Sequence, residues 1–164
     1  MKRLFLIGGP MGVGKTAVGQ RLKTVLPNAV FLDGDWCWDA NPFQVTGETR
    51  AMAMDNICYL LNGFLRCTAY ENVIFCWVMH EQGILDGILA RLDTADCVVT
   101  AASLLADEAT LTARILSDVE RGVRLPDVLA RSLARVPLYA ALDTVKVDTV
   151  GKTVEDIADE IARL

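Results

Sequence analysis

The sequence predicts an α/β fold of three layers, in which a parallel β-sheet is covered by helices on both faces. Three observations predict this fold. Five apolar segments of strand length alternate with segments of helical periodicity along the 164 residues. The segment 72–78 is almost continuously apolar, as strands are when both faces of a sheet are buried. The first strand also leads through a glycine-rich turn directly into a helix. We therefore expect one domain over residues 1–164, a length that can bury a single core.

The strands are predicted where short apolar runs are bounded by turn or cap signals. The first run lies directly before the glycine-rich turn, and Pro27 marks the turn before the second. The predicted strands are 2–7, 28–32, 72–78, 96–102 and 144–148.

The helices are predicted from apolar residues that recur every three or four positions. Asp107 and Glu108 favour the start of one helix, and Gly122 favours its end. Pro126 suits the first position of the next helix, which we expect to end before Pro137. The predicted helices are 17–25, 46–67, 83–92, 107–121, 126–136 and 153–161, and 36–43 is expected to be a loop.

The glycine-rich turn matches the pattern G-x-x-x-x-G-K-T, which is typical of a phosphate-binding loop. Its glycines let successive backbone N–H groups point toward phosphate oxygens, and the new helix directs its positive dipole end at the same anion. Lys15 can reach the β- and γ-phosphates, and the Thr16 hydroxyl can ligate Mg²⁺. A chance turn between a strand and a helix is the alternative. The candidate nucleotide-binding residues are Gly9, Pro10, Met11, Gly12, Val13, Gly14, Lys15, Thr16 and Ala17.

Two carboxylates, Asp33 and Asp35, follow the second predicted strand with Gly34 between them. Ligands of parallel sheets bind beyond the carboxyl ends of the strands, where these side chains are expected. Phosphoryl transfer to a hydroxyl needs one group near the magnesium ion and another that accepts the hydroxyl proton. We assign Asp33 to the magnesium shell and Asp35 to the base. A simple strand-end turn is the alternative, and Glu81 after the third strand remains a second candidate for the magnesium shell.

The segment Leu32-Asp33-Gly34-Asp35 after a G-x-x-x-x-G-K-T loop resembles gluconate kinase and adenylylsulfate kinase. More loosely, the chain is similar to shikimate kinase and chloramphenicol phosphotransferase, which belong to the same group of small-molecule kinases. The resemblance implies a P-loop NTPase fold with strand order 2-3-1-4-5, ATP with Mg²⁺ as cofactors, and a short arginine-bearing lid. By family role, Asp35 contacts the acceptor hydroxyl. The sequence departs from these families by continuing Trp-Cys-Trp, so the acceptor stays unidentified.

The resemblance places the lid at about 114–131, where the chain is rich in arginine. Arginine suits a lid because its planar guanidinium group binds phosphate oxygens and stabilises the charge that is transferred. Arg121 and Arg124 are the leading candidates, since they flank the glycine expected to act as a hinge. Pairing of these arginines with Asp118 and Glu120 on a solvated helix face is the alternative.

Four further residues are candidates for contact with the acceptor. Trp36 and Trp38 follow directly on the proposed base, and neither strand nor helix periodicity places both rings in a core. His80 follows the third strand at the same sheet edge, although a lone histidine is often structural. Arg50 lies on the predicted helix 46–67, which follows the tryptophans. It can contact an anionic acceptor or can simply be exposed.

The composition excludes several classes of protein. A net charge of −5 argues against nucleic acid as the main partner. No apolar run approaches the roughly 18 to 20 residues that a membrane helix needs. Five cysteines without a C-x-x-C pair favour reduced thiols in the cytoplasm.

The sequence thus favours an ATP-dependent kinase that acts on a small molecule, a metabolite or an antibiotic. A nucleotide kinase is one alternative. A nucleotide-binding ATPase or switch protein is another, but it needs neither the Asp33/Asp35 pair nor the aromatic loop. The oligomeric state stays open.

Overall fold

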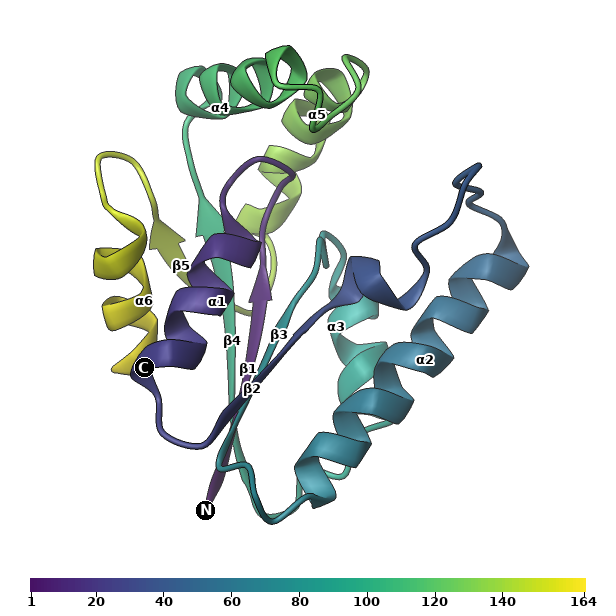
Figure 1. Cartoon of the computed structure of the whole chain (residues 1–164), viewed down its shortest axis with the longest axis vertical. Helices are drawn as coiled ribbons and strands as arrows, with labels where there is room; N and C mark the ends of the chain where they lie inside the picture. Colours follow the sequence, from purple (N-terminus) through teal and green to yellow (C-terminus); the bar gives the residue numbers. More distant parts are fainter.

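The five predicted strands form one parallel sheet in the order β2-β3-β1-β4-β5 in a computed structural model that describes residues 1–164 (Figure 1). Every neighbouring pair of strands is parallel. The predicted fold class and strand order are confirmed. The strands are β1 (Lys2–Gly8), β2 (Ala29–Asp33), β3 (Asn72–Cys76), β4 (Cys97–Leu105) and β5 (Val145–Asp148).

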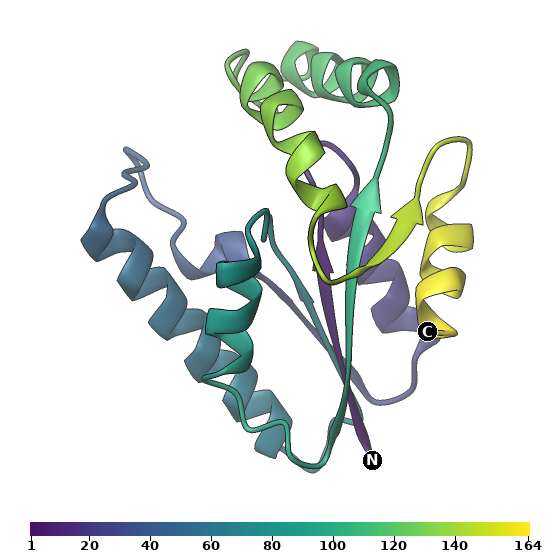
Figure 2. The ribbon, with the colours of Figure 1, turned by 180° about the vertical axis from the view of Figure 1, so that it is seen from behind.

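Helices cover both faces of the sheet, and two more lie beyond its carboxyl edge. Helices α1 and α6 lie on one face, α2 and α3 on the other, and α4 and α5 extend past the strand ends (Figures 1 and 2). The helices are α1 (Lys15–Val25), the short 3₁₀ helix η1 (Gly34–Cys37), α2 (Gly47–Arg66), α3 (Gln82–Leu89), α4 (Glu108–Glu120), α5 (Val128–Ala140) and α6 (Val154–Ala162).

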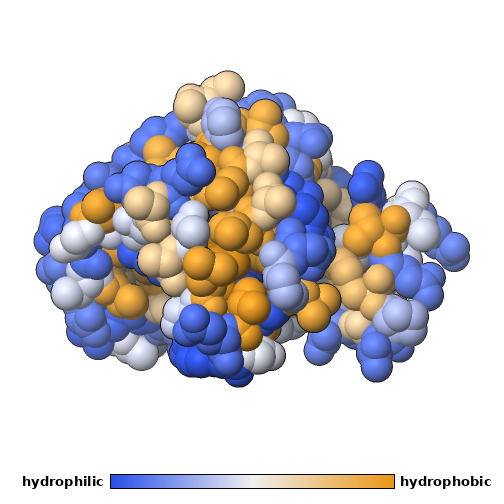
Figure 3. Space-filling view, turned by 90° about the horizontal axis from the view of Figure 1, so that it is seen from above, coloured by the Kyte–Doolittle hydropathy of each residue, from blue (hydrophilic) through white to orange (hydrophobic).

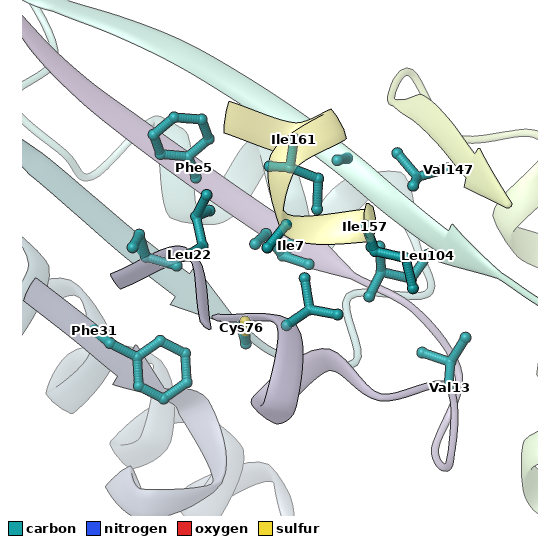
Figure 4. Close-up of a cluster of buried hydrophobic side chains, with 14 of the residues drawn as sticks. Phe5, Ile7, Val13, Leu22, Phe31, Cys76, Leu104, Val147, Ile157 and Ile161 are labelled. Atoms are coloured by element: carbon teal, nitrogen blue, oxygen red, sulfur yellow. The ribbon is translucent and has the colours of Figure 1, made fainter. Parts of the chain in front are cut away.

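Each face of the sheet has its own apolar core. Figure 4 shows Ile7 of β1, Leu22 of α1 and Ile161 of α6 close together in the first core. Phe75 of β3 and Leu61 of α2 belong to the second core. Alternate residues of β1 contribute to the two cores, which is why this central strand is buried on both sides.

Some predicted boundaries were wrong. β4 continues to Leu105, beyond the predicted end at 102. The last helix before β5 begins at Val128, so Pro126 lies in the preceding turn, and the helix passes through Pro137 instead of ending before it. Proline removes one helical hydrogen bond. Here the helix continues because Tyr139 is fully buried and its hydroxyl donates to the Val78 carbonyl over 2.6 Å.

Candidate active site

The phosphate loop joins β1 to α1 at the carboxyl edge of the sheet, where the sequence placed it. Gly12 adopts φ 83°, a left-handed conformation that favours glycine. A Cβ atom at this position would also lie 2.6 Å from Cγ1 of Ile115 on α4. The loop therefore needs glycine both for its backbone conformation and for close contact with the helix above it.

Lys15 begins α1 and its side chain folds back over the loop. Its ammonium group donates to the carbonyl oxygens of Gly9 at 2.8 Å and Pro10 at 3.0 Å. Desolvation lowers the pKa of Lys15 to about 8, with Arg124 acting in the same direction and Asp35 among the groups that raise it. A phosphate anion beside this ammonium group would favour its charged form.

The side chain of Asp33 links the end of β2 to the start of α1 by a hydrogen bond. Its carboxylate accepts from the Thr16 hydroxyl at 2.6 Å and from the backbone N–H of Asp35 at 3.0 Å. These oxygens suit Mg²⁺, which is usually held by one or two protein groups together with phosphate oxygens. No cluster of three or more histidine, cysteine or acidic side chains is present that could hold a metal ion. Glu81, the other candidate, lies instead with its carboxylate 3.3 Å from His80 Nε2.

Asp35 lies in η1, directly after the end of β2, at the same edge of the sheet. Desolvation raises the pKa of its carboxyl group, and the negative charge of Asp33 raises it further. Lys15, a hydrogen bond from the Trp77 side chain and the charge of Arg124 act in the opposite direction. These effects show that Asp33, Asp35, Lys15 and Arg124 lie close enough to influence one another's charge.

Gly34 holds the two carboxylates in place because it packs directly on an indole ring. A Cβ atom at Gly34 would lie 2.5 Å from Cγ of Trp77. That ring is itself held by Trp38, with centroids 6.1 Å apart, and by Phe75, with centroids 6.4 Å apart. The indole therefore has little freedom to move away from an added methyl group.

We predict that Gly34→Ala lowers the free energy of unfolding by about 1–3 kcal/mol, the usual effect of overpacking a filled site. Urea unfolding measures this change. Gly63→Ala is the matched control, since this α2 glycine has open space around its Cβ position. The control is expected to gain roughly 0.5–1 kcal/mol because alanine favours a helix. Equal unfolding midpoints for wild type and Gly34→Ala would refute the close packing.

The helices α4 and α5 are docked on the phosphate loop by side-chain contacts to its backbone. Arg114 of α4 donates to the Val13 carbonyl at 3.1 Å and to the Thr149 hydroxyl at 3.2 Å. The buried hydroxyl of Ser132 on α5 donates to the Met11 carbonyl at 2.8 Å. These contacts fix the arginine-rich segment directly above the loop.

Arg121 and Arg124 both bind the carboxylate of Asp118, as the alternative from the sequence suggested. Arg124 donates through Nε over 2.8 Å and is 31% exposed. Arg121 pairs with the other carboxylate oxygen and is 66% exposed. Only Arg124 is near enough to affect the pKa values of Lys15 and Asp35. The two arginines are therefore not equivalent in this arrangement.

A second group of basic side chains faces the site from the opposite side. Arg50 lies in the first turn of α2, on the same face as buried Ile57, and its own side chain is exposed. Burial lowers the pKa of His80, and the charges of Arg135 on α5 and Arg50 lower it further, whereas Glu81 raises it. The Nδ1 atom of His80 is buried without a hydrogen-bond partner. Neither arginine forms a salt bridge with an acidic residue.

The two candidate tryptophans take different positions. Trp36 is 56% exposed and packs edge-on against Phe31, with ring centroids 5.4 Å apart. Trp38 packs edge-on against Phe43 at 4.9 Å and also touches Trp77. Both line a groove of about 390 Å³ between η1, the loop after it and α2. Asp35 does not line this groove, so the tryptophans lie beside the carboxylates and not over them.

The sequence analysis missed two residues of this region. Trp77 was predicted only as part of the strand 72–78. Its place at the carboxyl end of β3, where ligands of parallel sheets bind, could have marked it as a site residue. Arg135 of α5 lies beyond the predicted lid, and its charge lowers the pKa of His80. No sequence signal reveals this second position, because it depends on how α5 packs against the β3 end.

All five cysteines are free thiols. None of the helices combines the length and apolar character required for crossing a membrane.

Three comparisons with known proteins agree with this architecture. The chain is 29% identical over 168 residues to a Pyrococcus furiosus protein provisionally named adenylate kinase, covering 98% of this chain and 83% of that protein. The fold matches the tunicamycin resistance protein of Deinococcus radiodurans with a TM-score of 0.76 and 18% identity, covering 99% and 95% of the two chains. A gluconokinase from Sinorhizobium meliloti 1021 matches with a TM-score of 0.69 and 19% identity, covering 97% and 89%.

The structural matches identify a P-loop kinase fold. The sequence model of one P-loop family, described as AAA domain, matches residues 6–127, from β1 to the turn before α5. This match covers well over half of the chain and includes the phosphate loop, both strand-end carboxylates and α4. The chain therefore belongs to the AAA domain family.

Proposed function

We propose that this protein is an ATP-dependent kinase that transfers the γ-phosphoryl group to a hydroxyl of a small, negatively charged molecule. One observation carries the proposal: Asp33 binds Thr16 of the phosphate loop at 2.6 Å and places Asp35 beside Lys15. A protein that only binds or hydrolyses nucleotide does not need a second carboxylate at this position. The kinase names of its relatives and neighbours support the same assignment.

In the proposed mechanism, the acceptor hydroxyl oxygen forms a bond to the γ-phosphorus while the bond from that phosphorus to the β–γ bridging oxygen breaks. Asp35 accepts the hydroxyl proton, and its raised pKa makes it a stronger base than an ordinary aspartate. Lys15 leaves the Gly9 and Pro10 carbonyls to bind the β- and γ-phosphates. Thr16 and Asp33 would hold Mg²⁺, which supplies charge neutralisation on the phosphates. ADP leaves with the bridging oxygen.

The proposed acceptor is an anion because of the basic group opposite Asp35. Arg50 and Arg135 form no salt bridge with an acidic residue, and the charges of both lower the pKa of His80. The Nδ1 atom of His80 has no hydrogen-bond partner. Two unpaired guanidinium groups in a protein of net charge −5 favour a carboxylate or phosphate on the bound molecule. A nucleoside monophosphate is the second candidate, favoured by the adenylate kinase name of the Pyrococcus furiosus relative.

Single-turnover ADP release tests the proposal. The wild-type protein with ATP and magnesium is mixed with D-gluconate, with its neutral counterpart D-glucitol, with AMP, or with no acceptor. We expect an anionic acceptor to accelerate ADP release, with the matching phosphorylated product seen by mass spectrometry. Preference for AMP would identify a nucleotide kinase. A rate that no acceptor changes, with free phosphate as product, would instead identify an ATPase or switch protein.

We propose that residues 114–131 act as the lid and that Arg124 contributes more than Arg121. Arg124→Ala is expected to lower kcat by about a hundredfold, the scale for one lost charge-stabilising group. Arg121→Ala should have a smaller effect, because its side chain is mostly exposed and bonds only to Asp118 and the Ser117 carbonyl of α4. Arg66→Ala is the control, since this exposed residue ends α2 near the start of β1, at the opposite edge of the sheet. A larger loss in Arg121→Ala would reverse this ranking.

A further inference from the structure

The groove beside η1 is a built cavity that the phosphoryl-transfer mechanism leaves unused. Its volume of about 390 Å³ falls within the range of small-ligand pockets. Trp36 and Trp38 form one side, and Met52 and Asn56 of α2 form the other. Asn56 donates to the Cys37 carbonyl at 2.9 Å, which ties the two sides together.

Several apolar side chains are exposed at or beside this groove. The exposed fractions are 56% for Trp36, 55% for Phe43, 49% for Val45 and 44% for Met52. Seen from above, the loop and the start of α2 form a separate lobe at the right, with apolar atoms on its surface and a hollow between it and the body (Figure 3). Clustered exposed apolar side chains typically mark a binding surface.

The groove is continuous with the carboxylates of the candidate active site. Cys37 lines the groove, and Trp36, which also lines it, directly follows Asp35 in η1. Desolvation raises the pKa of the Cys37 thiol, and the nearby charges of Asp33 and Asp35 raise it further. On the other side, Trp38 touches Trp77, whose side chain hydrogen-bonds to Asp35. A molecule with its hydroxyl at Asp35 therefore has the groove within reach of its remaining atoms.

We infer that the groove binds an aromatic or other flat apolar part of the phosphoryl acceptor. The indole rings offer flat faces and edges for such a group, and an aromatic ring buried against them gains both apolar burial and ring contacts. The acceptor is then an amphipathic anion, with its charge near Arg50 and its ring in the groove. This inference rests on the proposed function for the identity of the bound molecule.

The test compares 4-nitrophenyl β-D-glucuronide with methyl β-D-glucuronide, two anionic polyols that differ only in the aromatic group. Affinity is measured without nucleotide by isothermal calorimetry and by quenching of tryptophan fluorescence in the Trp77→Phe background. We expect the aryl glucuronide to bind at least about tenfold more tightly, a modest gain for burying one ring. The preference should disappear in Trp36→Ala and in Met52→Ser, which alter opposite walls of the groove.

Tyr59→Ala is the matched control, because this α2 tyrosine is 77% exposed and does not line the groove. It should keep the full preference for the aryl compound. Equal affinities for both compounds, including no binding of either at millimolar concentration, overturn the inference. So does a preference that survives both groove variants. ADP release is followed in parallel, so that the two claims are tested separately. Aryl preference without phosphoryl transfer would support the aromatic-binding groove and contradict the kinase activity. Phosphoryl transfer without aryl preference would support the kinase activity and contradict the aromatic-binding groove.

Discussion

Lys15→Ala is expected to remove most of the thermal stabilisation that ATP with magnesium gives to the wild-type protein. Nucleotide at about a hundred times its dissociation constant adds roughly 2.7 kcal/mol to the stability of the protein that binds it. For a domain of this size, that corresponds to an increase in Tm of about 5–10 °C. The loss is expected because we propose that Lys15 supplies the positive charge nearest to the bound phosphates. Without nucleotide, its ammonium group contacts the Gly9 and Pro10 carbonyls. Differential scanning fluorimetry with and without nucleotide measures the shift.

Arg21→Ala is the control for this experiment, since it removes a positive charge from the exposed side of the same helix. It should leave the ATP-induced shift unchanged. An equally large shift in Lys15→Ala would show that the loop does not bind the phosphates as proposed. Without nucleotide, Lys15→Ala is expected to fold normally, because the wild-type ammonium group is desolvated in the folded state and its pKa is lowered to about 8.

Asp35→Asn is expected to lower turnover by about a hundredfold or more while nucleotide binding stays nearly intact. A lost general base typically has an effect of this size, and asparagine keeps the shape of the side chain. Asp159→Asn, on the exposed side of α6, is the control for the change in charge. Steady-state kinetics with the best acceptor measures turnover, and thermal shift measures nucleotide binding. Unchanged turnover in Asp35→Asn would remove this residue from the mechanism.

The pH dependence of turnover gives a second test of Asp35. Transfer requires the ionised carboxylate, so the rate falls as the pH drops through the pKa of Asp35, which is raised above the ordinary aspartate value. The Trp77 hydrogen bond lowers this pKa, so Trp77→Phe should move the acid limb of the profile to higher pH. An acid limb that stays in place in this variant would show that another group controls it.

Local sequence patterns predicted the phosphate loop and the strands around it because both depend on short-range chemistry. Glycine conformations, a lysine and a threonine at fixed spacing define the loop wherever it occurs. The apolar segment at 72–78 predicted β3 at Asn72–Cys76, since a strand buried on both faces is mostly apolar. The end of α5 was not predictable in this way. Pro137 is a local signal to stop, and the distant packing of Tyr139 overrides it.

The sequence pattern by itself therefore predicted the fold class of this protein, and the resemblance to small-molecule kinases implied the strand order that the structure has. It also indicated that a phosphate loop and the Asp33/Asp35 pair meet at one sheet edge, because parallel strands bring their carboxyl ends together. Only the tertiary structure decided which arginines face that edge. Arg124 and Arg121 have similar sequence contexts, but their different exposure follows from how α4 and α5 dock on the loop. The basic group of Arg50, His80 and Arg135 comes from α2, the connection between β3 and α3, and α5. Its positions depend on packing that no local pattern encodes.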